Sequence, residues 1–250
     1  MNNLLLIDGH SIMNRAFYGI PMLTNHEGIH TNAIYGFINI MLKAMEDEKS
    51  DHIAVAFDLK APTFRHKMYE MYKGTRKPMP AELHEQVPVI KEILASMNIP
   101  VITLEGYEAD DILGTVGKKA QSLGYNVVIL SGDRDLLQLA DEHIKIRLPK
   151  TIKGRTEIEN YYPEDVMEKY MATPSEFIDL KALMGDSSDN IPGVPGIGEK
   201  TAMSIISKYH SIENAYEHVE ELTPTKAKNS LRENYDLAKL SKVLATIETD

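Results

Sequence analysis

The sequence predicts an α/β fold in which a mostly parallel central sheet carries helices on both faces and is followed by a helical C-terminal subdomain. Two observations support this prediction. Over the first 150 residues, short runs rich in Val, Ile and Leu alternate with longer amphipathic segments, which is the pattern of strand–helix–strand units. After Pro163 the strand-like runs stop, and short helical segments separated by proline and glycine take their place. We therefore expect two units, residues 1–160 and 161–250.

Four apolar runs are the predicted strands, and their length and composition are typical of buried parallel strands. They cover residues 4–7, 53–57, 100–104 and 127–130. The amphipathic segments between them predict helices over residues 32–48, 81–98 and 109–123. Thr31 and Pro80 suit helix starts, and Gly124 suits a helix end.

The composition excludes several classes of protein. The 250 residues include no cysteine, which excludes disulfides, thiolate zinc sites and cysteine nucleophiles. No apolar run approaches the roughly 18 residues of a membrane span, and the N-terminal apolar run lacks the basic flank of a signal peptide. We expect a cytoplasmic protein. Its net charge of −10 is unlike that of a simple nucleic-acid coating protein, which would be basic.

Acidic residues gather after the predicted strands. Asp8, Asp58 and Asp133 come directly or shortly after three of the strands. Because the carboxyl ends of parallel strands share one edge of a sheet, these side chains are expected in one crevice. The further acids that we place there are Glu108, Asp110, Asp111, Asp135, Asp186 and Asp189.

A lone aspartate is more often a helix cap or turn residue, but nine acids in one crevice would repel one another unless cations lie among them. Oxygen ligands without cysteine or a histidine cluster favour Mg²⁺ or Mn²⁺. Two such ions would form the clamp that is used in phosphodiester hydrolysis.

A basic segment, residues 60–77, follows the second predicted strand. It carries six basic residues against the single acid Glu70, and its aromatic residues include Tyr72. Such a segment is typical of a phosphate-binding region that can also stack bases, although a solvated helix face is the alternative. The basic residues are Lys60, Arg65, Lys67, Lys73, Arg76 and Lys77.

A second candidate for nucleic-acid binding is a glycine-rich turn. Gly193, Gly196 and Gly198 let the backbone approach a phosphate, and a helix beginning near residue 199 would point its N–H groups at the anion. Lys200 adds a positive charge, and Thr201 follows it. Such a contact positions a duplex without reading its bases. The alternative is an ordinary turn between two helices.

Six motifs stand in a recognisable order. They are LIDG at residues 6–9, FD at 57–58, YKGTR at 72–76, EADD at 108–111, GDRD at 132–135 and GDSSDNIPGVPGIG at 185–198. Together they resemble the 5′–3′ exonuclease, or flap endonuclease, family, over about residues 3–248. Within that family the resemblance is strongest to the members that form the N-terminal part of bacterial DNA polymerases.

The resemblance implies a resolvase-like, or PIN-like, core with two metal clusters. The first cluster would consist of Asp8, Asp58, Glu108, Asp110 and Asp111. The second would consist of Asp133, Asp135, Asp186 and Asp189. Two Mg²⁺ or Mn²⁺ ions are implied, and a third is left open.

The resemblance also implies where DNA binds. Lys73 and Arg76 would stand at the base of a helical arch over about residues 60–97, beside the scissile phosphate. Residues 185–209 would form a helix–three-turn–helix that holds duplex DNA with a bound K⁺, and Tyr18 would stack near the terminal base pair. Asn32 departs from the family, which commonly has glycine there.

The implied activity is hydrolysis of 5′ flaps, nicked duplexes and RNA primer ends in DNA replication and repair, by a monomer that is fused to a DNA polymerase or cooperates with one. A small-molecule phosphatase is an alternative, but it would not need the glycine-rich turn or the basic segment. A non-catalytic DNA-junction binder is another, but it predicts losses among the nine acids, and all nine are present.

Overall fold

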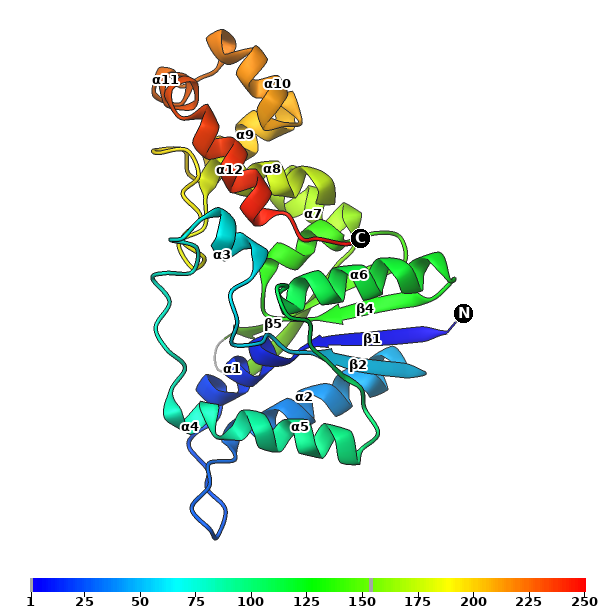
Figure 1. Cartoon of the computed structure of the whole chain (residues 1–250). Coiled ribbons are helices and arrows are strands. Elements are labelled where there is room, and N and C mark those ends of the chain that lie inside the picture. Colours follow the sequence, from blue (N-terminus) through cyan, green and yellow to red (C-terminus); the bar gives the residue numbers. More distant parts are fainter. Residues whose placement is uncertain (1, 153–154) are drawn as a thin grey trace.

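The computed structural model describes residues 2–152 and 155–250, and it contains one six-stranded sheet of order β3-β2-β1-β4-β5-β6 (Figure 1). The first five strands run parallel, and β6 pairs antiparallel with β5. The strands are β1 (Asn3–Asp8), β2 (His52–Ala56), β3 (Val101–Ile102), β4 (Asn126–Leu130), β5 (Ile144–Ile152) and β6 (Arg155–Tyr161). The predicted fold class is confirmed.

Helices cover both faces of the sheet. The helices of the first part are α1 (Gly9–Gly19), α2 (Asn32–Glu48), α3 (Phe64–Met68), α4 (Ala81–His84), α5 (Gln86–Ser96), α6 (Ala109–Ser122) and the 3₁₀ helix η1 (Arg134–Leu139). Figure 1 shows α6 on one face and α2 with α5 on the other. Successive side chains of a strand point to opposite faces of the sheet. In β1, Leu6 packs in the apolar cluster that contains α6, whereas Leu5 and Ile7 pack in the cluster that contains α1, α2 and α5.

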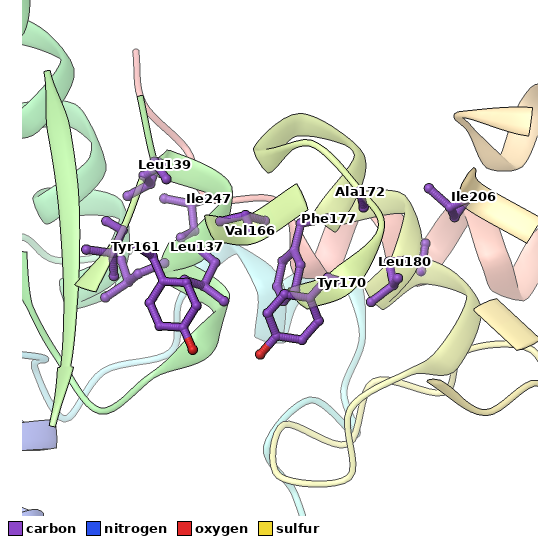
Figure 2. Packing of buried hydrophobic residues seen from close by; sticks show 14 of the residues in the cluster. Leu137, Leu139, Tyr161, Val166, Tyr170, Ala172, Phe177, Leu180, Ile206 and Ile247 are labelled. Carbon is purple, nitrogen blue, oxygen red and sulfur yellow. The ribbon is translucent and has the colours of Figure 1, made fainter. Parts of the chain in front are cut away.

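The C-terminal part is helical. Its helices are α7 (Pro163–Tyr170), α8 (Pro174–Met184), α9 (Glu199–Tyr209), α10 (Ile212–Glu217), η2 (Val219–Glu221), α11 (Thr225–Glu233) and α12 (Tyr235–Ala245). Proline at the first helical position suits α7 and α8, because that N–H has no intrahelical partner. Figure 2 shows Leu137 of η1, Val166 of α7 and Phe177 of α8 in one apolar cluster, so the helical part continues the core of the sheet.

Helix α1, the 3₁₀ helix η1 and strands β5 and β6 are absent from our sequence prediction. Helix α1 begins at Gly9, where Asp8 caps it by accepting a hydrogen bond from the Ser11 N–H. Strands β5 and β6 contain charged residues among their apolar ones, so they lack the continuous apolar run that marks a buried strand. The predicted helix over residues 81–98 forms as α4 and α5, which meet at Glu85.

The helical arch was expected over about residues 60–97, the range that contains α3, α4 and α5. Only α3, α4 and α5 are helical within residues 60–97, and residues 69–80, which we call the strap, contain turns but no helix. Figure 1 shows the strap running between the C-terminal helices and α4 beside the sheet.

The α4–α5 end of the strap is fixed by a buried amide pair. The Gln86 side-chain oxygen accepts hydrogen bonds from the Ala33 and Ile34 N–H groups at the start of α2, and its Nε2 donates to Asn32 Oδ1 at 3.1 Å. Asn32 Nδ2 donates in turn to the carbonyl oxygens of Phe17 and Ile20. Both amides are fully buried. Asn32 therefore joins α1, α2 and α5, which explains why this chain uses an amide there.

Within the described ranges, no helix has the length and apolar character needed to cross a membrane.

Candidate active site

The acids of the site stand where three parallel strands end. Asp8 closes β1, and its carboxylate accepts hydrogen bonds from Ser11 N–H at 3.0 Å and Ser131 Oγ at 2.7 Å. Asp58 follows β2; its Oδ1 accepts from the Ala109 N–H at 2.8 Å, and its Oδ2 lies 3.3 Å from His10 Nδ1. These contacts fix both carboxylates before any ligand binds.

Two adjoining hollows contain eight of the nine predicted acids. The first, of about 250 Å³, is lined by Asp8, Asp58, Glu108, Asp110 and Asp133. The second, of about 500 Å³, is lined by Asp133, Asp135, Asp186 and Asp189. Asp133 lines both hollows, so the two clusters implied by the resemblance share a residue.

Asp111 is the exception, and its prediction as a metal ligand is corrected by its contacts. It is only 1% exposed and lines neither hollow. One carboxylate oxygen accepts hydrogen bonds from Arg65 and the Glu248 N–H, and the other accepts from Arg65 and the Glu108 N–H. Asp111 therefore supports Glu108 from behind, which the spacing of EADD does not reveal.

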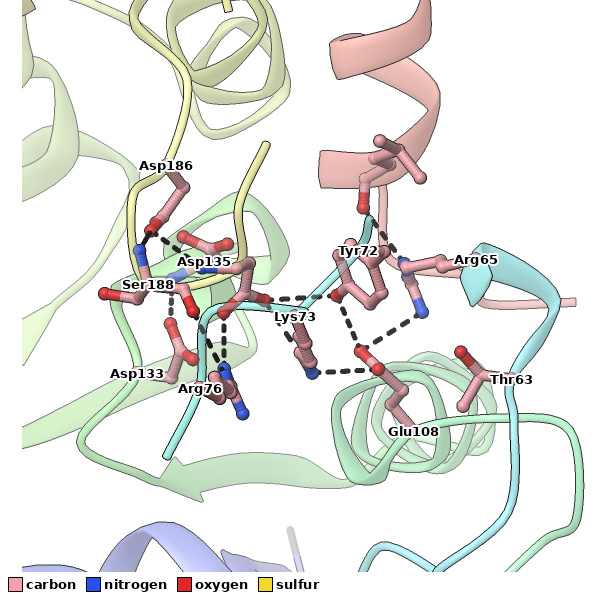
Figure 3. A network of polar contacts seen from close by, with 12 residues as sticks. Thr63, Arg65, Tyr72, Lys73, Arg76, Glu108, Asp133, Asp135, Asp186 and Ser188 are labelled. Atoms are coloured by element: carbon pink, nitrogen blue, oxygen red, sulfur yellow. Dashed lines mark hydrogen bonds and ion pairs between the residues drawn. The ribbon is translucent and has the colours of Figure 1, made fainter. Parts of the chain in front are cut away.

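Basic side chains line both hollows, and Figure 3 shows two of them, Lys73 and Arg76. Lys73 Nζ lies 2.8 Å from Glu108 Oε1 and 3.7 Å from Asp189 Oδ2, and Arg76 pairs with Asp189. Lys181 of α8 pairs with Asp186 and lies 2.6 Å from Asp135 Oδ1. Lys181 is absent from our sequence prediction, because a single lysine among the apolar residues of a helix carries no motif.

Burial and repulsion between carboxylates shift the pKa values of acids in both hollows. Burial, with nearby Asp58 and Asp133, raises the pKa of Asp8 to about 6. Burial and the Asp133 carboxylate also raise the pKa of Asp135 to about 7 and that of Asp110 well above its usual range. Asp58 behaves differently: burial opposes its ionisation, but hydrogen bonds from His10 and the Ala109 N–H bring its pKa down to about 2.

The donor set fits hard divalent cations. Among residues 2–152 and 155–250, no three acidic or histidine side chains already have the arrangement of a metal site, and Lys73, Arg76 and Lys181 pair with several of the carboxylates instead. The oxygen-only donors and the raised pKa values nevertheless indicate a local shortage of positive charge that Mg²⁺ or Mn²⁺ would relieve.

We expect Mg²⁺ to raise the melting temperature more at pH 8 than at pH 5. The raised pKa values mean that Asp8 and Asp135 hold protons at pH 5, which the metal must displace, whereas at pH 8 both are ionised and each is repelled by the Asp133 carboxylate. Scanning fluorimetry with and without Mg²⁺ measures the shift. Asp51→Asn, at the opposite edge of the sheet, is the control that keeps this pH dependence. Equal shifts at both pH values would contradict the expectation.

Two predicted DNA contacts are not at the surface. Arg65 and Tyr72 are each 3% exposed. The Tyr72 hydroxyl lies 3.0 Å from Glu108 Oε2 and 3.1 Å from Asp189 Oδ2, and the Arg65 guanidinium faces Asp111. The prediction that they contact DNA is corrected, because their polar groups form hydrogen bonds with buried carboxylates of the protein. Tyr18, in contrast, is 73% exposed beside a cavity that reaches Gly132.

The glycine-rich turn lies between α8 and α9. Gly193 packs on the backbone of Gly185, so close that a Cβ would lie 2.4 Å from the Gly185 nitrogen. Its lack of a side chain therefore serves the fold rather than a ligand. Gly196 and Gly198 are exposed, with a φ of +79° at Gly196 and open space around Gly198. Lys200 and Thr201 lie in the first turn of α9.

Two further residues of the site area were missed by sequence reasoning. His10 contacts Asp58, but a single histidine after LIDG carries no recognisable signal. Lys226 of α11 reaches over Gly196, where a Cβ would lie 3.2 Å from its Cε atom. Its position thirty residues later in the chain could not be linked to the turn without the fold.

Comparison with known protein families shows which family this chain belongs to. Residues 3–171 match the N-terminal resolvase-like domain of the 5′–3′ exonucleases, and residues 172–250 match their C-terminal SAM fold. The chain belongs to the 5′–3′ exonuclease family. The resemblance seen in the sequence is confirmed, and with it the expected class of enzyme.

Members of the 5′–3′ exonuclease family align along the whole chain. DNA polymerase I of Bacillus subtilis is 50% identical over 247 residues, covering 99% of this chain but 28% of the relative. DNA polymerase I of Geobacillus stearothermophilus is 49% identical over 249 residues, covering 100% of this chain and 28% of the relative. The chain thus spans little more than a quarter of these curated relatives.

Solved structures of the family share the fold. A bacteriophage T5 flap endonuclease in a pseudo-enzyme-product complex with DNA and metal ions aligns with a TM-score of 0.80 at 23% identity, over 99% of this chain and 90% of that one. A T5 5′-exonuclease with bound zinc aligns with a TM-score of 0.79 at 24% identity, with the same coverage. These likenesses support the fold class.

Proposed function

We propose that this chain is a structure-specific nuclease that hydrolyses phosphodiester bonds at 5′ flaps, nicks and RNA primer ends during DNA replication and repair. The observation that carries the proposal is the pair of adjoining acidic hollows, the first of which is also lined by Lys73 and Arg76 of the strap. Acids that can hold divalent cations, next to bases that can hold a phosphate, suit phosphoryl chemistry.

The residues that would hold two Mg²⁺ or Mn²⁺ ions are Asp8, Asp58, Glu108, Asp110, Asp133, Asp135, Asp186 and Asp189. When bound, such ions supply Lewis acidity and offset the charge of the phosphate. In this proposal Lys73 and Arg76 leave their carboxylate partners to bind the scissile phosphate, and His10 holds the Asp58 carboxylate in position.

Duplex DNA is assigned to the helical part, residues 161–250. We propose that the turn at 185–198 and α9 are the helix–three-turn–helix predicted over about residues 185–209, and that α8, directly before the turn, is its first helix. Gly196, Gly198, Lys200, Thr201 and Lys226 would approach the phosphates, and backbone carbonyls of the turn would bind K⁺. The exposed ring of Tyr18 is suited to stacking on a terminal base pair.

The wider setting also belongs to the proposal. Since the polymerase I relatives are more than three times longer, we propose that this nuclease works together with a DNA polymerase, as a monomer in the cytoplasm.

A labelled 5′-flap duplex tests the proposal. We expect cleavage near the junction in Mg²⁺ and none in EDTA. Lack of cleavage in Mg²⁺ and Mn²⁺ together with tight DNA binding would favour a non-catalytic junction binder. Hydrolysis of a small phosphate ester but not of the flap would favour a phosphatase.

Gly198→Thr is expected to weaken binding to all duplex-containing substrates by a similar factor, because the contact carries no base information. The site has a φ of −93° and open space, and threonine begins a helix about as well as glycine, so the fold should keep its stability. Binding titrations at several salt concentrations, with the melting temperature as control, check this. A changed sequence preference with unchanged affinity would show that the turn does not bind phosphate.

A further inference from the structure

Arg65 is a buried cation whose five N–H groups all have partners inside the protein. Its two terminal nitrogens each lie 2.8 Å from one carboxylate oxygen of Asp111, and Nη1 also lies 3.5 Å from Glu108 Oε2. Nε donates to the Leu244 carbonyl oxygen at 2.9 Å, and Nη2 donates to that of Thr246 at 2.6 Å. No donor is left for a phosphate.

The carbonyls that Arg65 binds belong to residues 244–248, which are the end of α12 and the residues that follow it. Gln138 of η1 holds the same segment, because its Nε2 donates to the Ala245 oxygen and its Oε1 accepts from the Ile247 N–H, both at 2.9 Å. The Glu248 N–H donates to Asp111 at 2.9 Å. Arg65 and Asp111 therefore join α3, the start of α6 and the last residues of the chain.

The same two residues determine where Glu108 lies. The Glu108 N–H donates to Asp111. One Glu108 carboxylate oxygen accepts hydrogen bonds from Arg65 and Tyr72, and the other pairs with Lys73 (Figure 3). Glu108 faces the first acidic hollow, whereas Arg65 lies behind it.

We propose that Arg65 is a positioning residue of the candidate active site, which holds Glu108, and through it the Lys73 ammonium, by clamping Asp111 and the segment 244–248. The inference rests on the proposed nuclease function. It assigns to Arg65 no contact with DNA. The planar guanidinium is needed because one flat group reaches a carboxylate and two carbonyls at once, whereas a lysine ammonium presents a single point of charge.

Arg65→Lys tests the clamp while it keeps a positive charge beside Asp111. We expect the single-turnover cleavage rate at saturating enzyme to fall about 10- to 100-fold, as is usual when a group that orients a ligand is lost. The dissociation constant for the flap substrate should stay within about threefold, and its salt dependence should not change, because no phosphate contact is lost.

Arg147→Lys is the matched control. Arg147 is also buried and pairs with two acids, Asp47 and Glu48, but it lines neither acidic hollow. We expect a comparable fall in melting temperature and an unchanged cleavage rate. A purely structural role for Arg65 would give the same result in both variants and would overturn the proposal.

A second outcome would also overturn the proposal. If Arg65→Lys binds DNA more weakly and the slope of log Kd against log salt falls by about 0.9, Arg65 is a phosphate contact. Should Arg65→Lys fail to fold, the double variant Arg65→Met with Asp111→Asn removes both buried charges. It should fold and cleave slowly, and a wild-type rate would refute the clamp. Wild-type cleavage is measured first, so failure of the nuclease function itself is seen separately.

Discussion

Asp8→Asn and Asp58→Asn are each expected to lower the cleavage rate of a 5′-flap substrate by at least about 10³-fold, while DNA affinity stays similar or rises. Each substitution removes one of the carboxylates that would hold the divalent ions. Removal of a negative charge also reduces repulsion of the phosphate, and binding depends on other residues. The test is single-turnover cleavage in Mg²⁺ beside a binding titration in EDTA.

Asparagine is the sharper substitution at residue 8. Asp8 caps α1 and accepts from Ser131, so alanine would destabilise the helix start by about 1 kcal/mol as well as removing the charge. Asp51→Asn, at the opposite end of the sheet, is a matched control that should cleave at the wild-type rate. Equal turnover of Asp8→Asn and the wild type at saturating Mg²⁺ would refute the assignment of Asp8.

Lys73→Ala and Arg76→Ala are expected to slow single-turnover cleavage by roughly 10²–10³, with a smaller loss of affinity. The transferring phosphoryl group gains negative charge in the transition state, and a fixed cation stabilises that state more than the bound substrate. Both cations stand at the mouth of the first hollow, although carboxylates bind them in the absence of DNA.

Lys77→Ala distinguishes stabilisation of the transition state from general electrostatic attraction of DNA. Lys77 lies on the same strap and lines the neighbouring cavity outside the acidic hollows. Its loss should weaken DNA binding and reduce the salt slope, with little effect on the rate at saturating enzyme. If Lys73→Ala behaves like Lys77→Ala, Lys73 is one phosphate contact among several. We also expect hydrogen exchange in the strap to slow when DNA binds, because residues 69–80 contain turns but no helix that would protect their amides.

Sequence reasoning located most of the fold because its signals were local. Four apolar runs and the segment 32–48 became β1 to β4 and α2, since buried parallel strands and amphipathic helices have distinct periods. Strands β5 and β6 were not predicted because charged residues interrupt their apolar residues. The division at residue 160 stays a prediction.

The candidate site was also predictable only where the signals in the sequence were local. The acids after β1, β2 and β4 could be placed together because parallel topology brings strand ends to one edge. The direction in which a side chain points could not be predicted: Asp111 stands beside Asp110 in sequence but turns into the core toward Arg65. Lys181 and Lys226 reach the site from helices that only the tertiary fold brings there.

The buried amide pair of Asn32 and Gln86 has a consequence for how this chain can vary. Glycine at residue 32 would leave the Gln86 amide and the carbonyls of Phe17 and Ile20 without their partner, in a place where both side chains are fully buried. A relative with glycine at this position must satisfy those groups differently, either through an ordered water or through another residue at 86. Residues 32 and 86 are therefore expected to vary together among related sequences. Exchanging only one of them between two relatives is expected to destabilise the fold, whereas exchanging both is expected to preserve it.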